Sequence, residues 1–483
     1  MTEQKQMTTP ITLYEGADLL TLDPLQPLIR NGAIAVSGTD ILAVGPQPDL
    51  AKTYGAQATR IDWSGRLVLP GLVDGHSHLF QSLGRTLGDG LSLLPWLERF
   101  MLPLAANVTR EDAIAIYRLA GLSSLLLGST AVIDNHYAPV DPETIVALAG
   151  EMEGLGLRGV VARGIFGPMV EGGRRMNCDP RLFRHSAAEE IDLNRACLDA
   201  HPPGGRVEIW PMPENVVYLD PELMIACAEL AAEHDIGWQI HCSESKFEVE
   251  IFESLYGKRP AIWMQAQGIL SDRASLAHGI WFDEAEIEAL GATETNIVHN
   301  PVCNQYLASG ILKLEPLLAA GANVCLGSDG MAVGGSGMFE AMKAGFLLQR
   351  LRELNPLATS AELMLEMATL RGAKLLRRDL GQLRAGKLAD FVALDLRGPV
   401  HQPLTRPAMA VVMAGLPPVT DVVVNGDIIV TGGRSTRLDH DKVISDGLQA
   451  AADLIDRAGL RGLVSDWIAP AHAIDATYRA GSN

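Results

Sequence analysis

The stretch LVLPGLVDGHSHLF (residues 67–80) runs from an apolar segment into two histidines, His76 and His78, that stand two positions apart. Residues i and i+2 of a β-strand point to the same face, so both imidazoles can aim at one point while Ser77 turns away. That is the geometry a chelating pair requires. A lone histidine at a strand end is more often a hydrogen-bonded structural residue, so the rest of the chain must decide between the two roles.

Outward from this stretch, short apolar runs rich in β-branched residues alternate with longer segments of helical composition, from about residue 68 to residue 330. This pattern is typical of parallel β/α units. Eight such runs close naturally into an α/β fold of the (β/α)8 TIM barrel type, whereas a doubly wound sheet more often uses about five or six strands. The predicted strands are Leu67–Val73, Ser129–Asn135, Arg158–Ile165, Val207–Pro213, Ile236–His241, Arg273–His278, Thr295–His299 and Ala322–Ser328.

Both ends of the chain carry antiparallel β signals, around Ile11–Leu22 and Ala33–Val44 and again at Phe391–Leu394 and Val422–Val430. Short β segments so far apart in sequence cannot each form a stable domain, so we expect them to pair into one small β-sandwich beside the barrel. The predicted division is 1–67 for the N-terminal half of the sandwich, 68–384 for the barrel, and 385–483 for the C-terminal half. A helical tail over Asp441–Trp467 is expected to pack on the surface.

The composition indicates a folded, soluble protein. Of its 483 residues 47% are apolar and 20% charged, and the net charge of −19 is spread along the chain without a basic block. We therefore expect no nucleic-acid or membrane partner, and a small neutral or cationic ligand is favoured. A polar N-terminus and the lack of a long apolar run predict a cytoplasmic location. The six cysteines occur singly, which predicts reduced thiols.

Polar residues end several of the predicted strands, at the face where a barrel carries its ligand site. They are His76 and His78 after the first run, His241 at the fifth, His278 at the sixth, His299 at the seventh and Asp329 after the eighth. Three imidazoles and a carboxylate converging without a cation would leave buried groups without partners, at a cost on the order of several kcal/mol. We therefore expect one divalent metal per chain, bound by His76, His78, His241 and Asp329. Nitrogen and oxygen ligands suit Zn²⁺ best, with Fe²⁺ as the alternative.

Glu244 lies three residues after His241. One interpretation is an exposed acid that favours the start of the next helix through the macrodipole. The other is a catalytic acid and base that takes a proton from an activated water and gives it to the leaving group. We expect the catalytic role, with His278 orienting the water or polarising the substrate, and with Asp329 both ligand and catalytic residue. The roles of His136 and His299 stay open.

Several stretches resemble the amidohydrolase superfamily, and within it the metal-dependent chlorohydrolases and deaminases that act on triazines, guanine, pterins and S-adenosylhomocysteine. They are LPGLVDGHSH (69–78), IHCSES (240–245), SLAHGIWF (275–282), IVHNPVCNQYLASGI (297–311) and CLGSDG (325–330). GQLRAGKLADFVALD (381–395) and VTDVVVNGDIIV (419–430) resemble the composite β domain of that family. The resemblance covers almost the entire chain. It implies a mononuclear metal site on the four residues above, with Glu244 as acid and base and His278 beside the water.

Two departures from the pattern concern the substrate. Relatives that act on nucleosides place a ribose-binding glutamate in a Trp-Pro-x-Glu segment, where WLERFMLPLAANV (96–108) has Ala105. A ribosyl substrate is therefore disfavoured. After Asp329 relatives commonly carry Ser-Asn, whereas this chain reads DGMAVGGSGMF (329–339), and its glycines Gly334, Gly335 and Gly337 indicate a reshaped loop at the pocket mouth.

The combined interpretation is a metal-dependent hydrolytic deaminase that releases ammonia from an amino-substituted triazine, pterin, purine or pyrimidine base. The alternatives are the same residues expelling chloride, an alkylamine or an amide nitrogen, or acting on an S-adenosylhomocysteine-type or adenosine-type nucleoside. A non-enzymatic relative is disfavoured, because it would have no reason to retain every ligand and the acid. We expect a small heterocyclic substrate as the partner and a homodimer or higher homo-oligomer as the assembly.

Overall fold

Eight parallel strands form the barrel of the computed structural model, which describes residues 10–333 and 337–465. They are β6 (Leu72–His78), β7 (Ser129–His136), β8 (Arg158–Ile165), β9 (Val207–Pro213), β10 (Trp238–Cys242), β11 (Ala274–His278), β12 (Asn296–His299) and β13 (Asn323–Leu326). Hydrogen bonds link β6 to β9 in one sheet and β10 to β13 in another, and a bridge between Asn215 and His241 joins the two. The short β14 (Asp329–Gly330) pairs with β6 and closes the ring. The predicted (β/α)8 barrel is confirmed.

The first predicted strand was placed wrongly. Leu67–Val73 is not one barrel strand: β5 (Leu67–Pro70) pairs with strands of the second sheet, and the barrel strand begins at Leu72. Gly71 lies between them and donates its N–H to the carbonyl of Asp390 at 2.9 Å. Because both segments are buried on both faces, the sequence shows one continuous apolar run. It does not mark the point at which the chain leaves the second sheet and enters the barrel.

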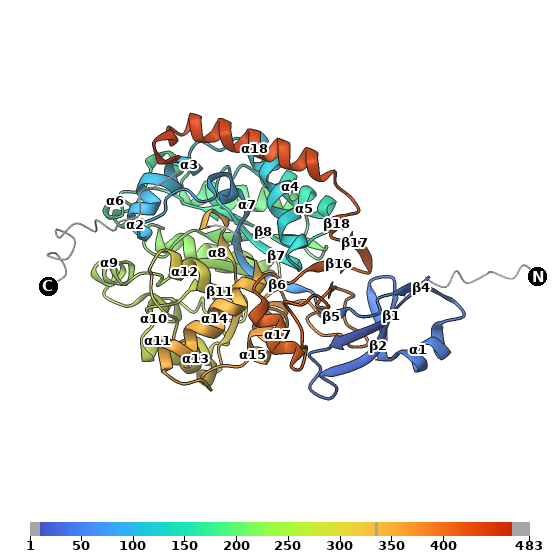
Figure 1. Ribbon diagram of the computed structural model, residues 1–483. Helices are drawn as coiled ribbons and strands as arrows, with labels where there is room; N and C mark the ends of the chain where they lie inside the picture. The colour runs from blue at the N-terminus through green and yellow to red at the C-terminus, as the bar shows by residue number, and fades with distance from the viewer. Residues whose placement is uncertain (1–9, 334–336, 466–483) are drawn as a thin grey trace, which may run out of the picture.

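Helices alternate with the barrel strands and lie around them (Figure 1). The longer ones are α4 (Arg110–Leu126), α5 (Pro142–Leu155), α7 (Ala187–Ala200), α8 (Pro221–Glu233), α9 (Lys246–Tyr256), α11 (Glu284–Ala292) and α14 (Met338–Glu353). Capping boxes start several of them. At α4, Thr109 Oγ1 accepts from the Asp112 N–H at 3.2 Å and Asp112 accepts from the Thr109 N–H at 2.8 Å.

Shorter helical segments lie around the barrel, except α1, which packs on the first three strands of the chain, in the second sheet. The short helices are α1 (Gln47–Tyr54), α2 (Leu93–Trp96), α3 (Leu102–Ala105), α6 (Glu171–Arg175), α10 (Pro260–Ala266), α12 (Pro301–Tyr306), α13 (Leu314–Ala320), α15 (Ala361–Met367), α16 (Leu370–Leu375) and α17 (Pro407–Ala414). Single turns of 3-10 helix are η1 (Leu79–Gly84), η3 (Pro180–Leu182), η4 (Met331–Val333) and η5 (Arg461–Leu463), and η2 (Leu97–Met101) is a π-helical turn. No described helix is long and apolar enough to cross a membrane.

Both chain ends build the second unit, as predicted. Its nine-stranded sheet contains β1 (Ile11–Leu20), β2 (Leu28–Ser37), β3 (Asp40–Pro46), β4 (Ala58–Asp62), β5, β15 (Phe391–Leu394), β16 (Val419–Val424), β17 (Asp427–Thr431) and β18 (Arg434–Ser435). The antiparallel pair β5 and β15 joins the N-terminal strands to the C-terminal ones. Asn425 and Gly426 have φ of 54° and 82°, so they form the predicted tight turn between β16 and β17. Figure 1 shows β1, β2 and β4 in a lobe beside the barrel.

The C-terminal helix α18 (His440–Arg457) lies along α4 (Figure 1). It turns Val443, Gly447, Ala450 and Leu454 inward, at helical spacing. The prediction of a helix from Asp441 to Trp467 was too long, because α18 ends at Arg457, before Gly459 at φ 70°. Trp467 lies outside the described residues. All six cysteines are buried and unpaired, as expected.

A buried ion pair ties the barrel to the second sheet. Arg158, at the start of β8, donates from Nε to Asp390 Oδ2 at 2.8 Å and from its Nη2 to Asn425 Oδ1 at 2.9 Å. The side chains of Arg158 and Asp390 are 6% and 0% exposed. Breaking such a pair leaves an uncompensated buried charge, which is far more costly than losing a surface pair.

We expect Asp390→Ala to lower the free energy of unfolding by about 3–5 kcal/mol, because Arg158 keeps a buried charge without its carboxylate. The double variant Arg158→Met/Asp390→Leu removes both charges and should regain most of this loss. Chemical denaturation followed by circular dichroism measures both. The control is Arg195→Ala, whose ion pair with Glu233 is 45% and 52% exposed, and which should change stability by less than about 1 kcal/mol. Equal losses for Asp390→Ala and Arg195→Ala would contradict this role.

Candidate metal centre and active site

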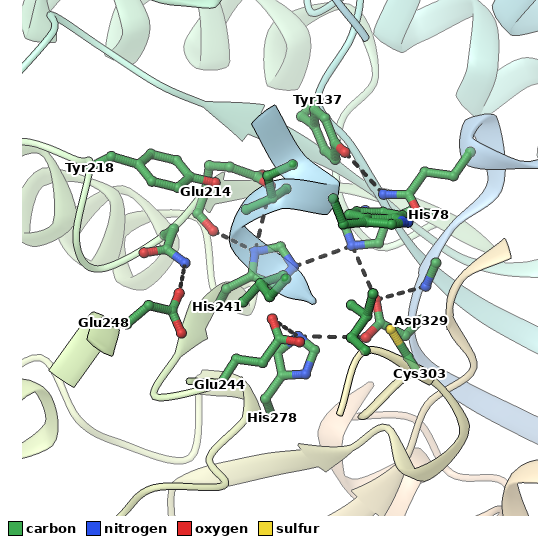
Figure 2. A pocket seen from close by; sticks show the side chains of 17 residues that line it. His78, Tyr137, Glu214, Tyr218, His241, Glu244, Glu248, His278, Cys303 and Asp329 are labelled. Carbon is green, nitrogen blue, oxygen red and sulfur yellow. Dashed lines mark hydrogen bonds and ion pairs between the residues drawn. The ribbon is translucent and has the colours of Figure 1, made fainter. Parts of the chain in front are cut away.

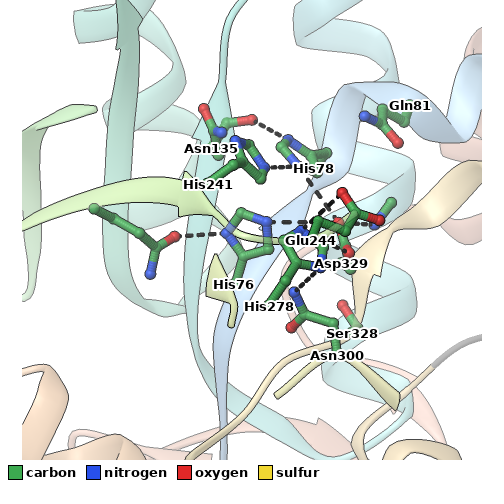
Figure 3. Close-up of polar contacts among 12 residues, drawn as sticks. His76, His78, Gln81, Asn135, His241, Glu244, His278, Asn300, Ser328 and Asp329 are labelled. Atoms are coloured by element: carbon green, nitrogen blue, oxygen red, sulfur yellow. Dashed lines mark hydrogen bonds and ion pairs between the residues drawn. The ribbon is translucent and has the colours of Figure 1, made fainter. Parts of the chain in front are cut away.

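The carboxyl ends of the barrel strands bring together the residues that the sequence singled out (Figure 3). His76 and His78 end β6, His241 lies in β10, His278 ends β11, and Asp329 begins β14. All five are buried. The approach of β6 to β13 requires a residue without a side chain, because a Cβ on Gly75 would lie 2.9 Å from Cys325 Sγ and 3.0 Å from the Leu326 carbonyl. The close approach of β6 to β13 thus explains why the motif DGHSH has a glycine at position 75.

Each imidazole of the candidate ligands is held at Nδ1 by a residue from another part of the barrel: Asn135 is on β7 next to β6, Glu214 follows β9 next to β10, and Gln239 of β10 reaches His76 across the barrel. The acceptors are Gln239 Oε1 for His76 at 2.6 Å, the Asn135 carbonyl for His78 at 2.9 Å and the Glu214 carbonyl for His241 at 2.5 Å. Donation from Nδ1 leaves Nε2 without a proton and free to bind a cation. The Nε2 atoms of His78 and His241 lie 3.2 Å apart, facing one another.

Asp329 completes the cluster. Its Oδ1 lies 3.5 Å from His76 Nε2 and 3.4 Å from His78 Nε2. Within the described part of the chain, His76 Nε2 and Asp329 Oδ2 are buried without a hydrogen-bond partner. Buried polar atoms are rarely left without a hydrogen-bond partner. Three imidazoles and one carboxylate form a ligand set that is typical of a divalent metal. The residues present fit such an ion.

The protonation of the cluster also suits a cation. Burial lowers the pKa of His78 to about 3, and the His76 charge acts in the same direction. Burial alone would raise the pKa of Asp329, but the His278 and His76 imidazoles hold it well below its usual value. Burial opposes protonation of His76, but Asp329, Gln239 and Asp74 together outweigh burial and raise the pKa of this imidazole. A cation would therefore compete with a proton for His76.

Glu244 and His278 lie next to this cluster. Glu244 Oε1 accepts from Ser309 Oγ at 3.0 Å, and Oε2 lies 3.5 Å from His278 Nε2. The Asn304 amide donates to His278 Nδ1 at 2.9 Å, so the imidazole proton sits on Nε2, which is also 3.6 Å from Asp329 Oδ2. Burial raises the pKa of Glu244 well above its usual value, and the charges of Glu248 and Asp329 add to this. A carboxyl with a raised pKa is a stronger base than an ordinary one, so it can take up a proton and later release it.

Backbone strain marks the same place. Ser243, His278 and Asp329 have φ of 55°, 76° and 64°, in the left-handed region that residues other than glycine rarely adopt. Such strain persists only where the surrounding structure holds it, and it clusters at functional sites.

A cavity of about 50 Å³ adjoins the cluster. Its walls include His78, His241, Glu244, His278 and Asp329, the aromatic rings of Tyr137 and Tyr218, and the acids Glu214 and Glu248 (Figure 2). Trp96 also lines it. No lysine or arginine of the described chain lines it, so the cavity favours a neutral or cationic guest. The volume holds water but is smaller than a heterocycle, so a substrate must push lining side chains outward.

Other residues from the sequence analysis lie elsewhere. Ala105 is buried in α3 and lines a neighbouring cavity that shares Tyr137. His136 and His299 are buried and do not line the active-site cavity. Gly337 precedes α14, whereas Gly334 and Gly335 lie outside the described residues.

Sequence reasoning missed two buried acids. Asp74 lies within β6 and accepts from the Ser328 N–H at 2.8 Å and the Ser328 hydroxyl at 2.5 Å, which ties β6 to the chain before Asp329. Glu214 follows β9 directly and lines the cavity. The pattern that identified the histidines, a polar residue at the end of an apolar run, would have found Glu214 as well.

Comparisons with known proteins agree with this geometry. The model of the Amidohydrolase family matches residues 67–429. The chain is 31% identical to the 5-methylthioadenosine/S-adenosylhomocysteine deaminase of Nitratidesulfovibrio vulgaris, over 94% of this chain and 100% of that protein. It is also 31% identical to the 5′-deoxyadenosine deaminase of Methanosarcina mazei, over 92% and 98%. The atrazine chlorohydrolase of Arthrobacter aurescens TC1, solved in complex with zinc, is 27% identical and superposes with a TM-score of 0.84 over 91% of this chain and all of that one. The chain belongs to the Amidohydrolase family.

Proposed function

We propose that this protein is a metal-dependent hydrolytic deaminase that releases ammonia from an amino-substituted N-heterocycle. One observation carries the proposal: the ligand atoms of His76, His78 and His241, and likewise those of His76, His278 and Asp329, lie within 4.8 Å of one another, and all of these residues except His76 line one cavity together with Glu244. The deaminase names of the relatives support ammonia as the leaving group.

His76, His78, His241 and Asp329 would hold one divalent ion, for which we propose zinc. When bound, the ion supplies the Lewis acidity that makes water nucleophilic at neutral pH. Glu244 takes the proton of that water and carries it to the departing amino group. His278, with its proton on Nε2, faces both Glu244 and Asp329, where it orients the water by hydrogen bonding. The attacked carbon must be flanked by ring nitrogens that can take up the developing charge.

A second candidate is the same chemistry on a different substrate. The atrazine chlorohydrolase likeness favours chloride as a leaving group, and the names of the relatives favour a nucleoside over a free base. Against the nucleoside stands the absence of a ribose-binding glutamate from the segment WLERFMLPLAANV, in which Ala105 takes that position and lines the neighbouring cavity. We propose the free heterocycle as the preferred substrate.

We expect about one equivalent of divalent metal, mainly zinc, in protein purified from cells supplied with metal, and loss of activity on chelation. His241→Ala should lose the metal, because it removes one ligand, while the barrel stays folded. Elemental analysis and circular dichroism test both statements, with the surface variant His234→Ala as control. Metal-free protein that still releases ammonia would rule out this mechanism.

Glu244→Gln should retain the metal and lose about a hundredfold to ten-thousandfold in kcat, because the amide keeps the shape and cannot transfer the proton. Steady-state ammonia release measures this. Glu250→Gln, on the exposed face of α9, the helix that follows Glu244, is the control and should keep wild-type turnover. Turnover by Glu244→Gln near that of the wild type would show that another group transfers the proton.

The free base should be hydrolysed with a higher kcat/KM than its nucleoside, because ribose hydroxyls entering a site without partners lose hydrogen bonds to water. Adenine and adenosine, assayed side by side for ammonia, test the expectation, and aminotriazines and pterins extend it. If adenosine were the equal or better substrate, the nucleoside candidate would replace this one.

A further inference from the structure

Glu214 is a buried carboxyl in the cavity wall that the proposed chemistry does not use. It follows β9 and is 3% exposed. Its backbone carbonyl accepts the hydrogen bond of His241 Nδ1 at 2.5 Å, whereas its carboxylate Oε1 lies 3.5 Å from that nitrogen. Because the carbonyl already orients His241, the carboxylate is not needed to hold the candidate ligand in place.

Glu248, another glutamate of the cavity, has both carboxylate oxygens occupied. Glu248 Oε1 accepts from the Asn215 amide at 2.7 Å, and its Oε2 accepts from the Ser245 N–H at 2.7 Å. Glu244 is the proposed proton carrier. In Glu214, Oε2 accepts from the Asn135 amide at 3.1 Å, and no described residue donates a hydrogen bond to Oε1.

A buried carboxylate oxygen normally accepts at least one hydrogen bond. Since Oε1 belongs to a side chain that lines the cavity, its missing donor is expected to come from a molecule inside the cavity. A carboxylate oxygen accepts hydrogen bonds from N–H and O–H groups alike. On a free N-heterocycle, the substrate class proposed above, the donor is an amino group or a ring N–H.

The rings of Tyr218 and Tyr137 form part of the cavity wall beside Glu214. Tyr218 stacks on Phe166 with ring centroids 5.8 Å apart and planes 9° apart, and the Gln81 amide donates to the Tyr137 hydroxyl at 3.0 Å. Figure 2 shows Glu214 and Tyr218 on one side of His241 and Asp329 on the other. A flat ring whose reacting carbon lies beside Glu244 and Asp329 would thus present a different edge to Glu214.

We propose that Glu214 is a specificity-determining residue, which accepts a hydrogen bond from a second amino group or a ring N–H of the substrate. The inference rests on the proposed deaminase function and narrows its substrates to heterocycles that carry a donor besides the amino group that leaves. Diamino-substituted purines, pteridines, pyrimidines and triazines belong to this class.

The test compares metal-loaded wild-type enzyme and Glu214→Gln on matched substrate pairs that differ by one amino group. The pairs are adenine and 2,6-diaminopurine, 4-aminopteridine and 2,4-diaminopteridine, 4-aminopyrimidine and 2,4-diaminopyrimidine, and amino- and diamino-1,3,5-triazine. The wild type should favour the diamino member in at least one ring series. Glu214→Gln should lower the ratio of kcat/KM, diamino to monoamino, by about tenfold to a hundredfold through KM, since a hydrogen bond to a charged acceptor is lost.

Two controls separate recognition from structure. Glu248→Gln changes another buried glutamate of the same cavity, and it should affect both members of a pair alike, because Asn215 and Ser245 occupy its oxygens. Glu214→Asp keeps a carboxylate and should keep part of the preference, which tests the inference even if the glutamine variant folds poorly. Metal content should match the wild type in both Glu214 variants, because the backbone carbonyl that orients His241 is unchanged.

Two outcomes would overturn the assignment, provided that the wild type releases ammonia. One is an unchanged diamino-to-monoamino ratio of kcat/KM in Glu214→Gln. The other is an equal loss of kcat/KM on both members of a pair, accompanied by loss of metal. A wild type without preference for any diamino member would also overturn it. If the wild type released no ammonia from any pair, the proposed function would fail and this inference with it.

Discussion

The hydrogen bonds to the three Nδ1 atoms are the constraint on which the candidate active site depends. Strand β6 carries His76 and His78, whose Nδ1 protons are accepted by Gln239 of β10, across the barrel, and by the Asn135 carbonyl of the adjoining β7. His241 is fixed in the same way by the carbonyl of Glu214. Each ring therefore points Nε2 to the same small volume, where Asp329 brings a negative charge. This arrangement leaves His76 Nε2 and Asp329 Oδ2 buried without a hydrogen-bond partner among the described residues, which supports the proposed metal ion.

The site in turn depends on how the barrel closes. Asp74 binds Ser328, the residue before Asp329, so that the last strand is held against the first. Gly75 lets β6 approach β13 closely. The second sheet supports the same region, because β5 continues directly into β6 and Arg158 of β8 pairs with Asp390 beside β15. The strained backbone at His278 and Asp329 is held by these contacts.

Much of the fold and of the candidate site could be predicted because it depends on local patterns. Seven of the eight predicted runs match a barrel strand to within two residues at each end, and the Asn425-Gly426 turn needs only residues that tolerate positive φ. The first run could not be divided correctly, since β5 and β6 are both buried. The end of α18 was missed, because apolar residues such as Leu460 continue the pattern beyond Arg457, whereas Gly459 takes a φ of 70° and the helix has ended. Glu214 was overlooked although it also ends an apolar run.

The sequence by itself determined which chemistry is available. The spacing of His76 and His78 places both on one face of a strand, and the positions of His241, His278 and Asp329 at strand ends assign them to one rim of a barrel. Only the tertiary structure decided which atoms meet. The choice of Nε2 as the ligand atom, the proton on His278 Nε2, and the open oxygen of Glu214 all depend on hydrogen bonds between strands far apart in sequence. Those contacts exist only once the barrel has closed, because spacing along one strand contains no information on what lies across it.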